Sequence, residues 1–332
     1  MENFTAALLN TGKDARLLDH LAPFASLHML PLYLTEERNV ELCEKYYPEV
    51  EVIYVPYEEF SIFKLVERHD LLLQSTFWDK ELMELLKKVN PKVRFGFIPH
   101  GNSDKGYLKP MLKPLEHQDL CFLYGEQMVE RLKMQNIKTP PHFFTGNYRL
   151  DYYLKNKKFL DGLVPRFNNK NRIILYAPSW NDEEGGTSFF KEVKNLIESL
   201  PKSFNLILKT HPLLEEMDVG RFWAAMPEVR QENLLMLSEF PPIFPLLNMV
   251  DIYIGDTSSI GYDFLYFQKP MFFFNPFRDH PGMLLHQAGI TIPVKPFPFI
   301  QEHLHLFDEK KKEKQKELWE FAFGKVNSPC SK

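Results

Sequence analysis

The sequence has few cysteines, no long apolar run and no glycine-rich phosphate loop, and each absence argues against a class of protein. Its three cysteines, Cys43, Cys121 and Cys330, lie far apart among 332 residues. This spacing argues against a disulfide framework and a zinc site, and it indicates a reducing compartment. No stretch of about 18 uninterrupted apolar residues occurs, so no transmembrane helix is predicted. Residues 1–14 lack a basic region followed by an apolar run, so we expect no signal peptide.

Several motifs and charge patterns are also missing. Neither Gly-x-Gly-x-x-Gly nor a P-loop occurs, which argues against NAD enzymes and P-loop kinases. The Gly-x-Ser-x-Gly motif of the nucleophile elbow does not occur, which argues against an α/β-hydrolase. No Asp-x-Asp pair follows a strand to hold a metal–diphosphate complex, so a site without metal or cofactor is predicted. The formal net charge is only -4, so we expect no nucleic-acid partner. The predicted location is cytoplasmic, with peripheral contact at the inner membrane face left open.

What is present is the pattern of a folded α/β protein. The chain is 44% hydrophobic with 29 Phe, enough for a large core and, at this length, for two domains. Predicted strands cover residues 28–34, 50–55, 70–74, 93–99, 119–124 and 142–145 in the first half, and 172–177, 205–209, 234–237, 251–254 and 271–274 in the second. Predicted helices cover residues 79–88, 126–134, 188–200 and 259–267. This alternation predicts parallel sheets built from right-handed βαβ units.

The segment 155–171 is rich in Lys and Asn and contains Pro165, so it is predicted to be a linker. We therefore expect two Rossmann-like domains facing each other across a cleft. The first comprises residues 1–155 and the second residues 156–332, which include a C-terminal helix.

The strongest local motif runs from Asp251 to Phe264. A buried strand ends at Gly255, and a polar turn follows, formed by Asp256, Thr257, Ser258 and Ser259. Backbone N–H groups at a helix start, together with hydroxyls, attract a phosphate, and Gly255 and Gly261 permit close approach. The alternative is plain helix capping by Ser258 or Asp256.

Two histidines follow apolar strands. Lys209 and His211 end one strand in the second half and could contact a diphosphate, since ligands bind at the carboxyl ends of such strands. His100 follows a strand in the first half, in a loop bracketed by Gly101 and Gly106, and suits a general base for a hydroxyl that Asp104 could orient. For each histidine, the alternative is a surface residue without a role.

Two further segments offer polar groups at strand ends. Tyr176-Ala-Pro-Ser-Trp-Asn-Asp182 presents Ser179, with Trp180 as either a packing or a recognition residue. Asp182-Glu-Glu184 is predicted to be a solvated acidic loop and not a metal site. Arg149, in Thr145-Gly-Asn-Tyr-Arg-Leu-Asp151, is predicted to be available for an anion.

The tail combines a charge run at residues 309–316 with Leu318, Trp319, Phe321 and Phe323. The favoured interpretation is a solvated helix whose aromatic face packs on the protein. The alternative is a membrane-surface anchor.

Taken in order, five motifs between Arg94 and Pro276 resemble those of the CDP-glycerol glycerophosphotransferases, the polymerases and primases of teichoic-acid-type polymers, whose fold is called GT-B. The motifs are His100-Gly, Gly146-x-x-Arg-x-Asp151, Tyr176-Ala-Pro-Ser-Trp180, His211-Pro and Asp256-x-Ser-Ser259. The chain departs from the usual family pattern at Pro99, Asn102, Tyr148, Lys209 and Thr257.

The resemblance implies a role for each matching residue. His100 would be the base that deprotonates the acceptor hydroxyl, and His211 would contact the pyrophosphate of the donor. Ser258 and Ser259 would hold donor phosphate, and Asp256 is the acid that opens their motif.

The implied activity transfers a glycerophosphate-like group from CDP-glycerol, or a related CDP-alcohol, to a hydroxyl acceptor that is polymeric or lipid-linked, with release of CMP. One alternative is a GT-B nucleotide-sugar glycosyltransferase or UDP-sugar epimerase, which needs the same diphosphate site. The other is a non-catalytic relative that keeps only the fold.

Overall fold

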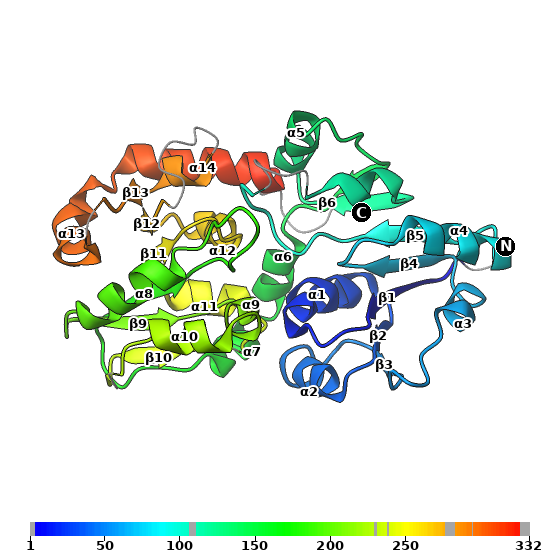
Figure 1. Ribbon diagram of the computed structural model, residues 1–332, viewed down its shortest axis with the longest axis horizontal. Helices are drawn as coiled ribbons and strands as arrows, with labels where there is room; N and C mark the ends of the chain where they lie inside the picture. The colour runs from blue at the N-terminus through cyan, green and yellow to red at the C-terminus, as the bar shows by residue number, and fades with distance from the viewer. Residues whose placement is uncertain are drawn as a thin grey trace. The chain divides into compact units, whose positions relative to one another are not determined.

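A computed structural model describes residues 4–105, 111–228, 231–237, 239–275, 283–293 and 295–325. Gly106, Pro276 and Cys330 lie outside these ranges. The chain forms two compact units. Unit 1 comprises Met1–Asn102, Pro110–Gly162 and Ala322–Lys332, and unit 2 comprises Ser103–Lys109 and Leu163–Phe321. In Figure 1 the strands of unit 1 run from blue to green and those of unit 2 from green to orange.

Unit 1 contains a parallel sheet of seven strands in the order β3-β2-β1-β4-β5-β6-β7. The strands are β1 (Ala6–Asn10), β2 (Leu32–Leu34), β3 (Val52–Tyr54), β4 (Leu71–Gln74), β5 (Arg94–Phe97), β6 (Leu120–Leu123) and β7 (His142–Phe144). Leu8 in β1 pairs with Leu32 on one side and Leu73 on the other. These central strands are short continuous apolar runs, as expected where helices cover both faces of a parallel sheet.

The helical elements between and directly after these strands are short. They are η1 (Ala15–Leu17), α1 (Leu18–His28), α2 (Glu37–Tyr46), α3 (Ile62–Val66), α4 (Lys80–Val89), η2 (Lys113–His117), α5 (Glu126–Met134), α6 (Tyr148–Lys155) and α7 (Lys157–Leu163). Helix α4 begins where the side chain of Asp79 accepts the N–H of Leu82 at 2.9 Å, an N-cap that fixes its first turn.

Unit 2 contains a parallel sheet of six strands in the order β10-β9-β8-β11-β12-β13. The strands are β8 (Arg172–Ala177), β9 (Phe204–Leu208), β10 (Leu234–Met236), β11 (Ile252–Gly255), β12 (Met271–Phe273) and β13 (Ile290–Thr291). This is the strand order of a dinucleotide-binding Rossmann domain, and unit 1 has the same order with one strand added. The predicted pair of Rossmann-like sheets is confirmed.

The helical elements of unit 2 are α8 (Phe189–Glu198), α9 (Pro212–Glu216), α10 (Val219–Ala225), α11 (Ile243–Met249), α12 (Ile260–Phe264), η3 (Leu265–Phe267), η4 (Leu285–Ala288), α13 (Pro296–His303), η5 (Leu304–Leu306) and α14 (Glu309–Phe323), whose last two residues group with unit 1. Val193 and Ile197 on α8 are fully buried against strand residues such as Ile174 and Leu206. Their spacing of four places both on one helix face.

Three predictions about local structure were wrong. Strand β1 was not predicted at all, although it lies at the centre of its sheet. The stretch predicted as a strand from His28 begins as the end of α1, because Leu21 and Phe24 bury the helix face that leads into it. The predicted linker is helical over Lys157–Leu163, where Leu160 is buried.

Helix α14 packs its apolar side against the protein, as the favoured interpretation predicted. Leu318 and Trp319 are buried, and the ring of Trp319 lies 5.3 Å from that of Tyr266. Gln315 is also buried and donates to the carbonyl of Lys269 at 3.0 Å. A membrane anchor through these aromatic side chains is therefore wrong.

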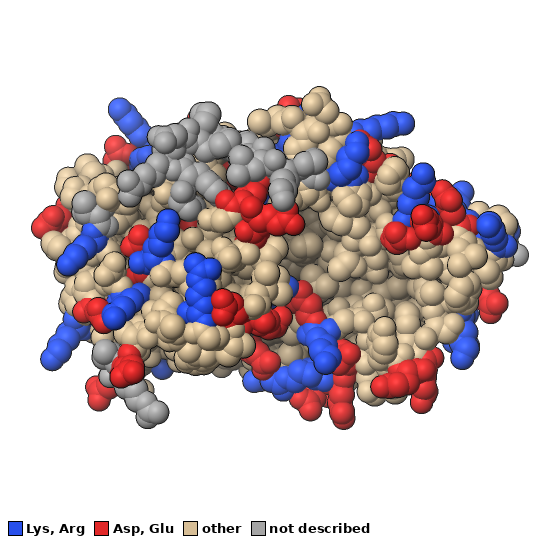
Figure 2. All heavy atoms as spheres, viewed as in Figure 1, with Lys and Arg blue, Asp and Glu red and all other residues tan. Residues whose placement is uncertain are grey.

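Charges of both signs share the surface of the molecule. Pairs such as Lys312–Glu309 at 2.6 Å and Lys314–Glu317 at 3.1 Å neutralise part of the positive charge of α14. On the face drawn in Figure 2, basic and acidic side chains lie interspersed. Among the described residues, no helix is both long enough and apolar enough to cross a membrane.

Candidate functional site

The sheet of unit 2 reverses its strand order between β8 and β11. Ala177, the last residue of β8, pairs with Gly255, the last residue of β11. In open parallel sheets, ligands bind beyond the carboxyl ends of the strands at such a reversal. The loops that follow these strands, residues 178–188 and 256–259, therefore form the candidate site.

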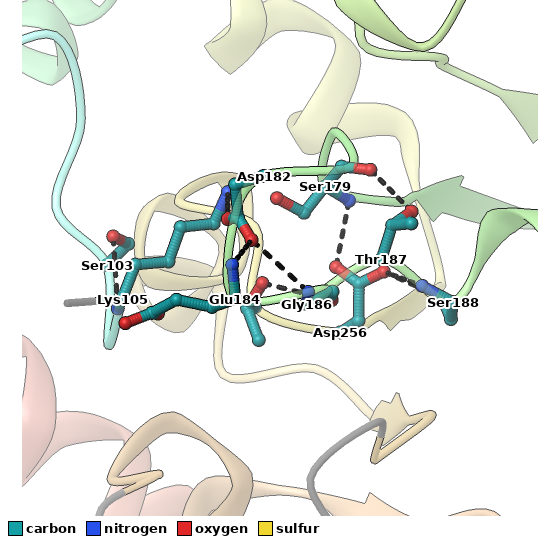
Figure 3. A network of polar contacts seen from close by, with 10 residues as sticks. Ser103, Lys105, Ser179, Asp182, Glu184, Gly186, Thr187, Ser188 and Asp256 are labelled. Atoms are coloured by element: carbon teal, nitrogen blue, oxygen red, sulfur yellow. Dashed lines mark hydrogen bonds and ion pairs between the residues drawn. The ribbon is translucent and has the colours of Figure 1, made fainter. Parts of the chain in front are cut away.

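A fully buried carboxylate joins these two loops (Figure 3). One oxygen of Asp256 accepts the N–H of Ser179 at 2.8 Å, and the other accepts the N–H and the hydroxyl of Ser188, both at 2.7 Å. Burial raises the pKa of the Asp256 carboxyl, and the hydrogen bonds from Ser188 and Ser179 offset part of the rise. Three hydrogen-bond donors occupy the two carboxylate oxygens of Asp256. The structure therefore gives Asp256 the role of positioning the two loops, in place of the predicted contact with the nucleotide.

The turn after Asp256 is held from the same loop. Thr257 is 2% exposed, and its hydroxyl donates to the carbonyl of Gly186 at 3.2 Å. This hydroxyl therefore makes a contact within the protein in place of the predicted contact with the nucleotide. Ser259 is the N-cap of α12 and makes no side-chain capping bond. The capping alternative therefore does not describe this turn, and the hydroxyls of Ser258 and Ser259 stay predicted phosphate donors.

The glycines of this motif make room for a protein side chain. A Cβ atom on Gly255 would overlap the ring of Tyr253, and one on Gly261 would lie 2.6 Å from Leu285 Cδ2 and 3.3 Å from the Tyr253 hydroxyl. The close approach that these glycines permit is therefore that of Tyr253 and Leu285.

The loop after β8 is fixed at Ser179 and at Asp182. The carbonyl of Ser179 accepts the hydroxyl of Thr187 at 2.7 Å. The side chain of Asp182 accepts the N–H of Glu184 at 3.0 Å and of Gly186 at 3.3 Å. The N–H and the carbonyl of Ser179 are thus both held by hydrogen bonds. Contact of its hydroxyl with the nucleotide stays a prediction.

The acidic stretch is exposed only at Glu183, whereas the prediction was a solvated loop. The side chain of Asp182 is 0% exposed and forms an ion pair with Lys105 at 3.0 Å, and Glu184 is buried as well. The ion pair and the hydrogen bonds within its own turn satisfy the buried carboxylate of Asp182. Within the described residues, no group of three His, Cys, Asp or Glu side chains is arranged to hold a metal ion.

His211 lies at the end of the next strand along the sheet. It is the N-cap residue of α9 and is partly exposed. Its ring stacks on Trp180, with 6.1 Å between centroids and 24° between planes. The Nζ atom of Lys105 lies 5.4 Å from the Trp180 ring centroid, a cation–π distance. Trp180 therefore connects the loop after β8 to the predicted phosphate-contacting histidine. Lys209 is anchored through its backbone N–H, which donates to Tyr176 at 3.0 Å.

In unit 1, His100 follows β5 and is exposed. Its Nδ1 atom lies 2.7 Å from the carbonyl oxygen of Ser75. A carbonyl only accepts hydrogen bonds, so Nδ1 carries a proton, and in the neutral ring Nε2 then has the lone pair. This tautomer is the one that a general base requires.

A second histidine lies beside it and was missed in the sequence. His20 is buried in α1, with its ring centroid 6.4 Å from that of His100. No local motif marks His20, and the helix that carries it was not predicted either. Only the fold brings the two rings together.

Arg149 is not available for an anion, contrary to prediction. It is 4% exposed and pairs with Asp19 at 2.9 Å. Asp19 also accepts the hydroxyl of Tyr47 at 3.1 Å. An isolated charge is costly to bury, so α6 places its arginine on the carboxylate of α1.

Asp104 belongs to unit 2. Its carboxylate accepts the hydroxyl of Tyr262 at 2.6 Å and the N–H of Leu285 at 2.9 Å. In His100, Nδ1 is held by Ser75, as described above. Asp104 thus holds Tyr262 and Leu285 in place within unit 2. Its predicted role of orienting His100 stays a prediction.

Comparison with known sequences identifies relatives. The sequence model of the CDP-Glycerol:Poly(glycerophosphate) glycerophosphotransferase family matches residues 102–284. The teichoic acid glycerol-phosphate primase of Bacillus spizizenii is 23% identical over 291 residues, which cover 80% of this chain and 73% of the relative. The teichoic acid glycerol-phosphate transferase of Staphylococcus aureus is 24% identical over 179 residues, 51% of this chain and 43% of the relative. The chain thus spans less than half the length of that second relative.

Solved structures agree on the fold. The wall teichoic acid polymerase TagF superimposes with a TM-score of 0.65 at 13% identity, covering 97% of this chain and 85% of that one. The UDP-GlcNAc 2-epimerase of Neisseria meningitidis gives a TM-score of 0.62 at 12% identity, covering 97% and 96%. At these identities the likeness extends to the fold alone, which is the predicted GT-B type.

Proposed function

The chain belongs to the CDP-glycerol:poly(glycerophosphate) glycerophosphotransferase family of enzymes, and from this premise we propose that it transfers glycerophosphate from CDP-glycerol to a hydroxyl acceptor and releases CMP. The acceptor is a polymeric or lipid-linked component of the cell envelope, and the reaction takes place on the cytoplasmic side, at or near the membrane. Residues 1–155 serve the acceptor and residues 156–332 the donor.

The reaction breaks the phosphoanhydride bond of CDP-glycerol and forms a phosphodiester bond to the acceptor. The acceptor oxygen attacks the phosphorus that carries glycerol, and the bond from that phosphorus to the oxygen bridging to CMP breaks. CMP leaves with the electron pair. The acceptor proton passes to Nε2 of His100 and then to solvent. The contact of Nδ1 with Ser75 at 2.7 Å supports this role, because it leaves Nε2 as the basic nitrogen.

Charge on the leaving phosphate is stabilised in unit 2. We assign this task to His211 and Lys209 after β9 and to the hydroxyls of Ser258 and Ser259 after β11. Preorganised donors of this kind are each worth about 3 kcal/mol of transition-state stabilisation. The stacking of His211 on Trp180 supports the assignment, because it restricts the imidazole before the donor binds.

The observation that carries the proposal is the buried contact of Asp256 with the loop after β8. The donors Ser179 N–H and Ser188 N–H and O–H bind one carboxylate at 2.7–2.8 Å. This contact assembles the two loops at the reversal point of the sheet, where a nucleotide donor is expected.

The test is CMP release from CDP-glycerol by the purified protein with a glycerophosphate-primed acceptor. His100→Ala is expected to abolish release, while His117→Ala, which changes an exposed histidine of the same unit, retains it. Full CMP release by His100→Ala would contradict the assignment of the base.

A thermal-shift panel separates the alternatives. Stabilisation by CDP and CMP is expected. Stabilisation by UDP alone would favour the nucleotide-sugar enzymes that share this fold. No response to any cytidine or uridine nucleotide would favour a non-catalytic relative.

A further inference from the structure

The loop that carries His100 is braced by a chain of hydrogen bonds within unit 1. The hydroxyl of Tyr124 lies 3.0 Å from the carbonyl oxygen of Pro99, the residue just before His100. The same hydroxyl lies 3.0 Å from Nδ1 of His20. Both Tyr124 and His20 are buried.

The direction of these bonds follows from the chemistry of the groups. The carbonyl of Pro99 only accepts, so Tyr124 donates its single proton there. The Tyr124 oxygen must then accept from His20, whose Nδ1 carries a proton. His20 thereby carries a proton on Nδ1, and the relay runs from His20 through Tyr124 to the peptide group before His100.

His20 is also kept free of charge. Burial lowers its pKa well below the ordinary value, and the nearby positive groups Arg149, His100 and Arg16 lower it further. A neutral ring 6.4 Å from His100 adds no positive charge next to an imidazole that must itself gain a proton.

We propose that His20 and Tyr124 are positioning residues for the His100 base: they fix the backbone that presents it, while Ser75 fixes the orientation of its ring. The second contact, from Ser75, holds Nδ1 at 2.7 Å. Two anchors, one on the backbone and one on the ring, restrict the imidazole and leave Nε2 as its basic nitrogen. This inference rests on the proposed role of His100.

The first test separates positioning from binding. Tyr124→Phe and His20→Ala are expected to lower kcat for CMP release by up to about 100-fold, the effect of a small misplacement of a reacting group, with the KM for CDP-glycerol unchanged. His20→Asn is expected to restore much of the activity, because its amide N–H can replace Nδ1–H as the donor to Tyr124. Tyr152→Phe is the matched control, since Tyr152 is a buried tyrosine outside the relay. Wild-type rates in Tyr124→Phe, or a His20→Asn variant as slow as His20→Ala, would overturn the proposal.

The second test does not depend on activity. Nitrogen chemical shifts in the wild-type protein are expected to show His20 and His100 as neutral Nδ1–H tautomers at pH 7, with the His20 tautomer lost in Tyr124→Phe. An Nε2–H or charged His20 would overturn the relay even if the enzyme is active. If both tautomers are observed but CDP-glycerol releases no CMP, the proposed function fails and the relay stands.

Discussion

Ser179 donates its backbone N–H to the carboxylate of Asp256 at 2.8 Å, although 77 positions separate the two residues. This bond and those from Ser188, 68 positions away, close the switch point of the second sheet. The motif around Asp256 is thus held in place by residues of the loop after β8. Asp256 therefore holds the two loops together, and the contact of Ser258 and Ser259 with a ligand stays a prediction.

Replacing Asp256 by Ala tests this role. The substitution leaves the N–H groups of Ser179 and Ser188 buried without their acceptor, so the free energy of unfolding should fall by about 3 kcal/mol. Urea denaturation measures the effect. Asp251→Ala is the control, because Asp251 is exposed and accepts the N–H of Ile173, and its substitution should cost about 1 kcal/mol. Equal losses in the two variants would contradict the role of Asp256.

Arg149 should matter for stability and not for donor binding. Arg149→Met leaves the buried carboxylate of Asp19 without its cation, which should destabilise the protein by about 3–5 kcal/mol. Since the guanidinium is buried within unit 1, the KM for CDP-glycerol should not change in the protein that remains folded. A large rise in KM with wild-type stability would restore Arg149 as an anion ligand.

His211 should affect the chemical step. His211→Ala is expected to lower kcat by about 100- to 1,000-fold, the cost of removing one preorganised donor to a charged transition state. Single-turnover CMP release measures it. Trp180→Leu removes the ring on which His211 stacks, so it should show a smaller loss of the same kind. A Trp180→Leu variant slower than His211→Ala would mean that Trp180 has a role beyond positioning.

Gly255 is predicted to be intolerant of a side chain. A methyl group there overlaps the ring of Tyr253 in the core of unit 2, and overpacking of this kind costs about 1–3 kcal/mol. The control is Gly12→Ala, because a Cβ at Gly12 meets nothing within 4 Å. Thermal unfolding of the two variants should show a lower Tm only for Gly255→Ala.

Much of the fold could be predicted from local pattern. Strand β8 and helix α5 have the predicted bounds, because apolar runs and helical periodicity are local properties. Strand β1 was missed because Ala6–Asn10 lacks β-branched and aromatic residues. The strand forms because it pairs with β2 and β4. Pairing between distant segments cannot be predicted from local propensity.

The site was predictable only in part for the same reason. Strand-end motifs located His100, His211 and the serine turn in the sequence. The partners of the charged groups could not be found in this way. Arg149 and Asp19 are 130 positions apart, and His20 meets His100 only because α1 packs in the same unit. An arginine in a motif looks the same in the sequence whether it binds a ligand or a buried carboxylate.

The pH dependence of stability should report His20. In the unfolded chain a histidine takes up a proton near pH 6.5, whereas burial and the charge of Arg149 lower the pKa of His20 in the folded chain. Below about pH 6.5 the unfolded chain therefore binds more protons, and acid shifts the equilibrium toward unfolding. Stability is thus complete above this pH and is lost as the pH falls toward the lowered pKa. Burial also lowers the pKa of His28, His69 and His286, which add to the same trend.

The contribution of His20 can be isolated by substitution. His20→Asn removes one proton-binding group, so the slope of the unfolding free energy between pH 5 and 6.5 should become shallower by up to about 1.4 kcal/mol per pH unit. Urea denaturation at a series of pH values measures the slope. His117→Asn, at an exposed position of the same unit, should leave it unchanged. An unchanged slope in His20→Asn would mean that His20 is charged in the folded protein, which is incompatible with a neutral donor to Tyr124.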